Sequence, residues 1–231
     1  MHGETWAPGR SFARAVGMAA RLTALGALLV SGAARAVDRE GSGRIGISGG
    51  LRLVPNNPFV QDARAAGYDV TRDTGLGPSA LATFGYWIDS NFELSIEGGY
   101  GHDSYTVAGN NRGLTLDTET LMASLRWTFL TGYDIFPYLG ASFGYSFNGV
   151  SSPFQAPWDN WTATGYGEVA MVGIGYDLSD HVGLMAELRY TISVLQSPLP
   201  SSLNAGGLSL LVGVYLRIPR ASDNAIIPGS P

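Results

Sequence analysis

The chain has 231 residues, of which only 14% are charged, and a formal net charge of −5; soluble globular domains usually carry about 25% charged residues. It contains no cysteine and three histidines far apart in the sequence, which excludes disulfides and cysteine-ligated zinc and leads us to expect no metal and no cofactor. The acidic balance argues against nucleic acid as a partner, because phosphate binding needs a basic surface.

The first predicted element is a secretory signal peptide over residues 1–36. From Met18 the sequence reads MAARLTALGALLVSGAARA, with an apolar core from Leu22 to Val30 and a small-x-small cleavage site at Ala34-Arg35-Ala36. The core is about half as long as the roughly 20 residues that a membrane-spanning helix needs, so we expect cleavage rather than an anchor. Cleavage there leaves 10 arginines and 18 acidic residues.

Eight segments with period-two alternation follow, the pattern of strands with one apolar face. In the third, Phe92, Leu94 and Ile96 share one face, and Glu93 and Glu97 share the other. The sixth does not alternate clearly enough for its faces to be assigned. The predicted strands are residues 43–53, 79–88, 91–101, 116–129, 135–147, 162–177, 181–193 and 207–218.

The connections between these segments alternate between long and short. The long ones span about 54–78, 102–115, 148–161 and 194–206, whereas the short ones are 89–90, 130–134 and 178–180. This alternation is typical of an all-β, eight-stranded antiparallel up-and-down transmembrane barrel of the outer membrane, with tight turns in the periplasm and long loops outside. We therefore expect a barrel over residues 37–218 and a short periplasmic C-terminal tail over residues 219–231.

The size of the side chains on the two faces indicates which face meets lipid. A soluble, lipocalin-like barrel of eight strands would enclose its apolar face, but eight strands leave room inside only for modest side chains or one small ligand. The apolar faces here hold Leu, Ile, Phe, Tyr and Trp, while the opposite faces are mainly Gly, Ser and Thr with a few charges. We therefore expect the bulky face outside, in lipid.

Eight charged side chains in the segments lie, by parity, opposite the bulky apolar positions. A charge facing lipid at mid-depth costs about 2–4 kcal/mol, so these residues should point into the lumen and pair with one another. Such a network would close the barrel to most solutes. The predicted lumen network consists of Arg44, Arg52, Glu93, Glu97, Arg126, Glu187, Arg189 and Arg217.

Residues 137–149, PYLGASFGYSFNG, combine aromatic residues with glycines. On the barrel hypothesis Leu139, Phe143 and Tyr145 point outward, and Gly140 and Gly144 point into a crowded lumen, where a strand without side chains can also bend. Aromatic residues near strand ends predict two interfacial girdles. They comprise Trp87, Phe92, Trp127 and Phe129 toward the periplasm, and Tyr100, Tyr105, Tyr145, Phe147 and Tyr190 toward the outside.

With its leader and the segments PYLGASFGYSF, LMASLRWTF, VGLMAELRY and GGLSLLVGVYLRI, the chain resembles the small eight-stranded outer-membrane barrels: the OmpA transmembrane domain, the opacity-type proteins and the OmpW group. The resemblance implies the outer membrane of a Gram-negative bacterium, insertion by the barrel assembly machinery, contact with outer-membrane lipid and lipopolysaccharide, and a monomer. Such barrels usually finish on an aromatic residue of the last strand, whereas here PRASDNAIIPGSP follows Ile218.

Two functions are compatible with such a barrel. The first is a structural or surface-interaction role, in which the loop of residues 148–161 would bind lipopolysaccharide or a partner through Phe154, Trp158 and Trp161. The second is a narrow pore for small or hydrophobic solutes, which the OmpW resemblance implies. A pore needs a lumen without crossing ion pairs, so the predicted charge network favours the first.

A third hypothesis is an enzyme acting on lipid. His102 and Ser104 continue the outward parity of their strand, and Asp117 and Glu119 project outward from the next. A serine, a histidine and a carboxylate are the groups that acyl transfer requires, and the H-x-S pattern resembles the lipid A deacylases. The asparagine that follows in that family is replaced by Tyr105. Local polarity near a loop also explains these residues, so the favoured prediction is no enzyme.

Overall fold

A computed structural model describes residues 39–55, 58–65, 67–70, 75–107, 114–151, 160–195, 203–204 and 206–220. The predicted signal peptide lies outside this part of the chain, as does all of the predicted tail beyond Arg220.

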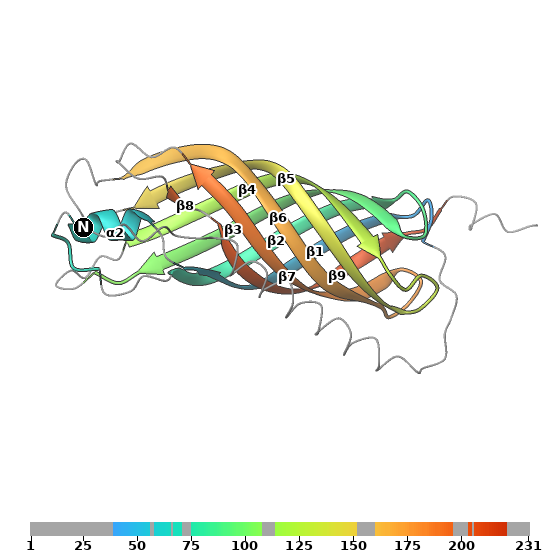
Figure 1. Cartoon of the computed structure of the whole chain (residues 1–231). Helices are drawn as coiled ribbons and strands as arrows, with labels where there is room; N and C mark the ends of the chain where they lie inside the picture. Colours follow the sequence, from blue (N-terminus) through green and yellow to red (C-terminus); the bar gives the residue numbers. More distant parts are fainter. Residues whose placement is uncertain are drawn as a thin grey trace, which may run out of the picture.

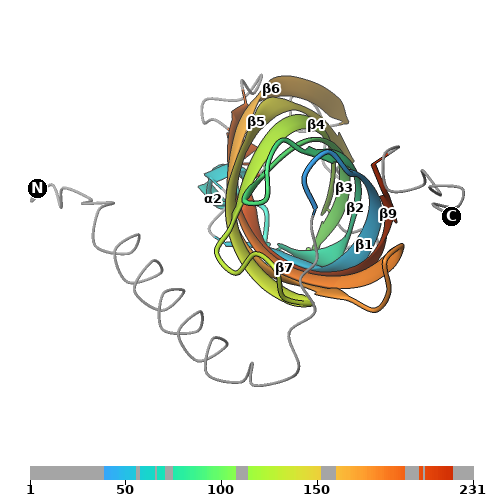
Figure 2. The same cartoon turned by 90° about the vertical axis from the view of Figure 1, so that its right-hand side faces the viewer.

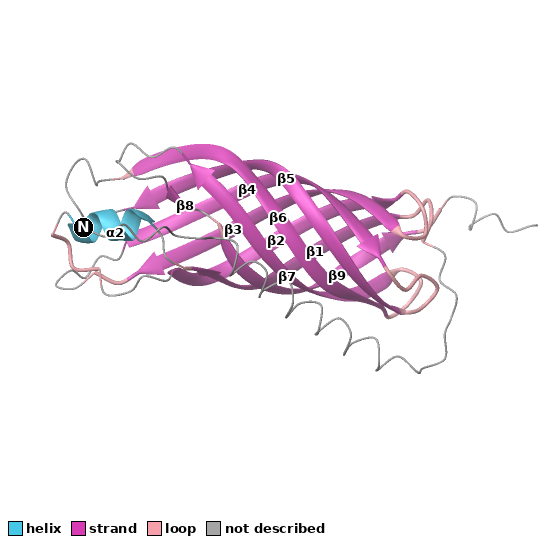
Figure 3. Ribbon diagram, viewed as in Figure 1, coloured by secondary structure: helices cyan, strands magenta, loops and turns pink. Residues whose placement is uncertain are grey.

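Eight long antiparallel strands form the described structure, with one short helix and one two-residue strand (Figures 1 and 3). All eight predicted segments are strands, so the predicted fold class is confirmed. The elements are β1 (Gly43–Val54), α2 (Pro58–Ala65), β2 (Gly75–Trp87), β3 (Phe92–Tyr105), β4 (Leu114–Thr128), β5 (Ile135–Ser151), β6 (Trp161–Asp177), β7 (Val182–Leu195), β8 (Leu203–Asn204) and β9 (Gly207–Ile218).

The long strands close on themselves. Each pairs with its neighbours along the chain, and β9 pairs with both β7 and β1, which completes the ring visible end-on in Figure 2. Short turns join β2 to β3, β4 to β5 and β6 to β7 at one end, here called the turn end. The other end, the loop end, carries α2 and β8 (Figure 1). Among the described residues, no helix has the length and apolarity to cross a membrane.

Several strands are longer at the loop end than their sequence patterns predict. The ladder between β3 and β4 continues to the pair Tyr105–Leu114, and the ladder between β5 and β6 continues to Val150–Trp161. The apolar alternation fades there because outward residues such as Asp117 and Thr162 are polar. Main-chain pairing needs no apolar face, and it continues past the point where the pattern stops.

The outer face is apolar and exposed. Ile47, Phe84 and Leu210 are 63%, 59% and 57% exposed, as expected of side chains that meet hydrocarbon. The alternation that was unclear in residues 162–177 is resolved by the structure: Tyr166 and Ile174 point outward, whereas Val169 and Met171 are buried inside.

The interior also holds a cluster of bulky side chains, whereas the sequence analysis expected mainly small residues with a few charges. Bulky side chains fill its turn-end half, and glycines on neighbouring strands make room for them. A Cβ atom on Gly183 would lie 2.1 Å from the ring of Tyr215, and one on Gly175 would lie 2.2 Å from the ring of Phe136. The interior bulky cluster consists of Trp87, Met122, Phe136, Tyr138, Val169, Met171, Met185 and Tyr215.

The 137–149 segment lies in the wall as expected. Leu139, Phe143 and Tyr145 are exposed on the outer face. A Cβ atom on Gly144 would lie 2.1 Å from the carbonyl oxygen of Leu121 on β4, so this glycine permits the close approach of the neighbouring strand.

The predicted girdles need two corrections. Trp87 and Tyr105 are each only 2% exposed and belong to the interior. Trp87 lies on the inward face of β2. Tyr105 lies on the inward face of β3, whereas Phe92 and Tyr100 of the same strand point outward. The other predicted girdle residues are at least partly exposed: Phe92, Trp127, Phe129, Tyr100, Tyr145, Phe147 and Tyr190.

Candidate functional site: the closed interior and the two rims

Three arginines and three glutamates form a network across the middle of the barrel. Arg126 on β4 is its centre, at 1% exposure. It pairs with Glu97, with Glu93 at 3.1 Å and with Glu187 at 3.5 Å. Because these carboxylates come from β3 and β7, the network links opposite parts of the wall.

The other two arginines balance the network. Arg44 lies 2.8 Å from Glu93, and Arg189 donates hydrogen bonds to Glu97 at 2.5 Å and to Glu187 at 2.6 Å. The phenol of Tyr138 also donates to Glu187, at 2.8 Å. Each buried carboxylate of this group therefore faces two arginines, which offsets the cost of removing the charges from water.

The remaining two predicted lumen residues also point inward, but they pair outside the predicted set. Arg52, near the loop end, lies 3.4 Å from Asp103. Arg217, near the turn end, lies 3.2 Å from Asp177. The expectation that all eight charges pair with one another was therefore wrong for these two, because they lie at other heights of the barrel.

The turn end is closed by a side chain from outside the strands. Arg39 precedes β1, is 1% exposed, and donates a hydrogen bond to Asp177 at 2.6 Å. Its guanidinium lies 3.9 Å from the ring centroid of Phe136, a cation–π contact. Tyr215 donates to the second oxygen of Asp177 at 2.5 Å. This group blocks the mouth with charge and aromatic rings together.

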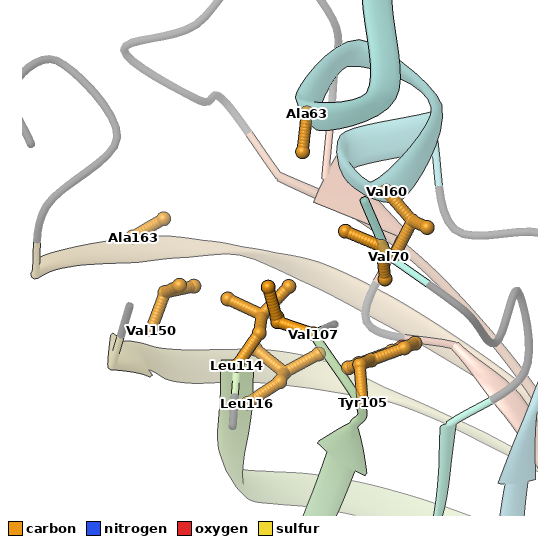
Figure 4. Packing of buried hydrophobic residues seen from close by; sticks show 9 residues of the cluster. All are labelled: Val60, Ala63, Val70, Tyr105, Val107, Leu114, Leu116, Val150 and Ala163. Carbon is orange, nitrogen blue, oxygen red and sulfur yellow. The ribbon is translucent and has the colours of Figure 1, made fainter. Parts of the chain in front are cut away.

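The loop end is closed by an apolar cap. Val60 and Ala63 of α2 pack over inward side chains at the loop ends of the strands, among them Leu114 and Leu116 (Figure 4). Buried polar surface gives way here to a small hydrophobic core built across the mouth. The cap consists of Val60, Ala63, Val70, Tyr105, Val107, Leu114, Leu116, Val150 and Ala163, with Tyr68 and Trp161 packed against it.

The described residues leave a small cavity beside the central network. A cavity of about 40 Å³ borders Arg52, Thr118 and Arg189, which is room for a few water molecules. At the turn end, the space beside Arg39 and Phe136 admits no water-sized volume.

Of the predicted loop-binding residues, Phe154 and Trp158 lie outside the described residues. Trp161 begins β6 and packs against the cap, so this side chain helps to order the loop end of the barrel.

The outward residues of the enzyme hypothesis lie on adjacent strands. His102 is opposite Asp117 in the ladder, and its Nδ1 lies 2.8 Å from Oδ1 of Asp117. The phenol of Tyr100 donates to the same oxygen at 2.7 Å. Ser104 is exposed and lies opposite Thr115, and Glu119 lies opposite Tyr100. The structure thus joins the histidine to Asp117 and not to Glu119.

Three charged residues of the interior were missed by the sequence analysis. Asp103 lies between His102 and Ser104, and the parity that places those two residues outward also places Asp103 inside with Glu93 and Glu97. Asp177 lies in the segment whose faces were unassigned. Arg39 precedes all predicted strands, and no local pattern indicates that it folds back into the barrel.

A closed ring of strands with an apolar outer face and a charged, filled interior defines a membrane-embedded β-barrel. The chain belongs to the outer membrane protein beta-barrel domain family, whose model matches residues 22–215. It is accordingly an outer-membrane protein of a Gram-negative bacterium. In barrels of this kind the short turns lie in the periplasm and the longer loops outside.

Solved structures with a similar fold include Neisserial surface protein A, at 16% identity and a TM-score of 0.49, covering 78% of this chain and 97% of that one. Outer membrane protein OprG of Pseudomonas aeruginosa has 12% identity and a TM-score of 0.45, covering 78% and 97%. The attachment invasion locus protein Ail of Yersinia pestis has 13% identity and a TM-score of 0.44, covering 78% and 99%. Comparison with curated protein sequences gives no match.

Proposed function

We propose that this protein is a structural or surface-interaction barrel whose extracellular rim engages lipopolysaccharide or a partner. The observation that carries this proposal is the closure of the lumen at three heights: the apolar cap, the central ion-pair network and the group around Arg39. A conducting pore would have to displace all three. The narrow-pore alternative is therefore disfavoured.

Two measurements test this function. In planar bilayers the purified protein should show no discrete single-channel openings, and regular openings would contradict the closed interior. For the rim, removal of residues 152–159 should leave the barrel folded, as judged by faster gel migration unheated than boiled. The same deletion should reduce binding to immobilised lipopolysaccharide, and unchanged binding would argue against this loop as the contact.

A second candidate, hydrolysis of a lipid acyl ester, is favoured by one contact. A hydrogen bond donated by the Nδ1–H of His102 to Asp117 would hold the imidazole so that Nε2 is available as a base, the role of the histidine in serine hydrolases. Ser104, two residues along on the same face, is the candidate nucleophile. An unchanged lipid A acylation pattern in cells carrying Ser104→Ala, compared with the wild type, would end this candidate.

A further inference from the structure

Two carboxylates face the membrane on the outer wall. Glu119 on β4 and Glu168 on β6 are both exposed on the outward parity of their strands. Each lies nine residues from the turn end of its strand, at Thr128 and Asp177 respectively. Because about 9–11 tilted residues cross the hydrocarbon, both carboxylates lie at its extracellular boundary.

Neither carboxylate has a cationic partner within the described part of the protein, where no ion pair or hydrogen bond involves Glu119 or Glu168. The contrast with neighbouring Asp117 is direct, since Asp117 accepts from both Tyr100 and His102. An unpaired charge at a membrane boundary is costly, and it usually marks a site that a partner completes.

Each carboxylate ends an apolar groove in the outer wall. The first groove, of about 790 Å³, runs across β9, β1, β2, β3 and β4, with small outward residues such as Gly49, Ala82 and Gly98 in its floor. Tyr100 and Glu119 border it at the extracellular side. Because this wall faces hydrocarbon, an acyl chain is the natural occupant of the groove.

The second groove repeats the design on another part of the wall. It has a volume of about 530 Å³ and contains Ala123, Ala141 and Ala170. Tyr190 and Glu168 border it, and they lie diagonally across the β6–β7 ladder, because Ala170 is opposite Tyr190 and Glu168 is opposite Ile192. The same combination of small residues, one tyrosine and one unpaired glutamate therefore occurs twice.

We propose that the two grooves bind acyl lipids whose headgroup carries a primary ammonium, one lipid in each. The acyl chain lies on the small residues, and the ammonium donates to Glu119 or Glu168. An anionic headgroup is disfavoured at both places, because its phosphate would face a carboxylate without an intervening cation. Two filled grooves would surround the barrel with selected lipid at the height where its rim leaves the membrane.

The test uses the full mature chain in vesicles made of equal parts phosphatidylethanolamine and phosphatidylglycerol with identical acyl chains, without divalent cations. Lipids that stay bound after transfer to mild detergent are counted by native mass spectrometry. We expect up to two retained lipids, with phosphatidylethanolamine preferred about fivefold. Glu119→Gln and Glu168→Gln should each remove about one preferred lipid, and the double variant should lose the preference.

One variant serves as a control, and two more test the grooves themselves. Glu40→Gln neutralises an exposed carboxylate before β1, away from both grooves, and should retain lipid as the wild type does. Ala82→Leu and Ala123→Leu fill the groove floors on the outward face without touching the interior, and should reduce the number of retained lipids. Faster gel migration of unheated protein verifies that each variant is folded.

Three outcomes would overturn the proposal. Equal retention of the two lipids would remove the headgroup preference. A preference that survives the double glutamine variant would place it elsewhere. Retention of phosphatidylglycerol that appears only when Mg²⁺ is added would assign the carboxylates to a metal-bridged phosphate.

Discussion

Replacing Arg126 by methionine tests how strongly the central network holds the barrel together. Before the change, three arginines face three glutamates within the network. Afterwards Glu93 retains only Arg44, and Glu97 and Glu187 share Arg189. One buried carboxylate charge is then uncompensated, and breaking a buried network in this way costs about 3–5 kcal/mol. At about 1.4 kcal/mol per factor of ten, the unfolding equilibrium constant should rise roughly 100- to 4,000-fold.

The free energy of unfolding can be measured by urea titration in lipid vesicles, followed by tryptophan fluorescence. The matched control is the double variant Arg126→Met with Glu97→Gln, which restores equal numbers of opposite charges and should recover a substantial part of the loss. If the single variant unfolds within about 0.5 kcal/mol of the wild type, the network does not carry the charge balance that the structure indicates.

Three further substitutions test the interior in the same assay, each against an outward control. Gly183→Ala places a Cβ atom against the ring of Tyr215 and should lower the free energy of unfolding by about 1–3 kcal/mol. The control Gly98→Ala, with no atom within 4 Å of the added Cβ, should be nearly neutral. Equal losses in the two variants would contradict the packing argument. Tyr215→Phe removes the hydrogen bond to Asp177 and should lower the free energy of unfolding by about 1.5–3 kcal/mol. The control Tyr176→Phe, on the outward face, should change it little. A larger loss in Tyr176→Phe than in Tyr215→Phe would place Tyr215 outside the turn-end group. Leu116→Ala opens a cavity in the apolar cap and should lower the free energy of unfolding by about 2–5 kcal/mol, with faster proteolysis of α2. The control is Leu121→Ala, which changes a membrane-facing residue. If α2 is cut no faster in Leu116→Ala than in this control, the cap does not hold the helix.

The barrel could be predicted from the sequence because its strands carry a local signal. The alternation of Phe92, Leu94 and Ile96 with Glu93 and Glu97 assigns both faces of β3 without knowledge of any other strand. The signal failed where one face lost its chemical contrast, as in β6, whose inward positions include Gly167 and Val169. The structure assigns that strand through its ladders with β5 and β7.

The sites followed the same division. Parity placed His102 and Asp117 on the same outward face, but only the ladder register brought them within hydrogen-bond distance. Parity also placed Arg52 and Arg217 inside, but the partners of these arginines depend on height along the barrel, which follows from the stagger of the strands.

The amino-acid sequence alone determined that the barrel has eight strands and, wherever the alternation was clear, that bulky apolar side chains face lipid and charges such as Glu97 and Arg126 are enclosed, because a strand's two faces repeat every second residue. Only the tertiary structure decided what closes the interior. Arg39 folds back onto Phe136 at the turn end, α2 packs across the loop end, and glycines lie beside aromatic rings. Those contacts join residues far apart in the chain, and no local periodicity encodes them.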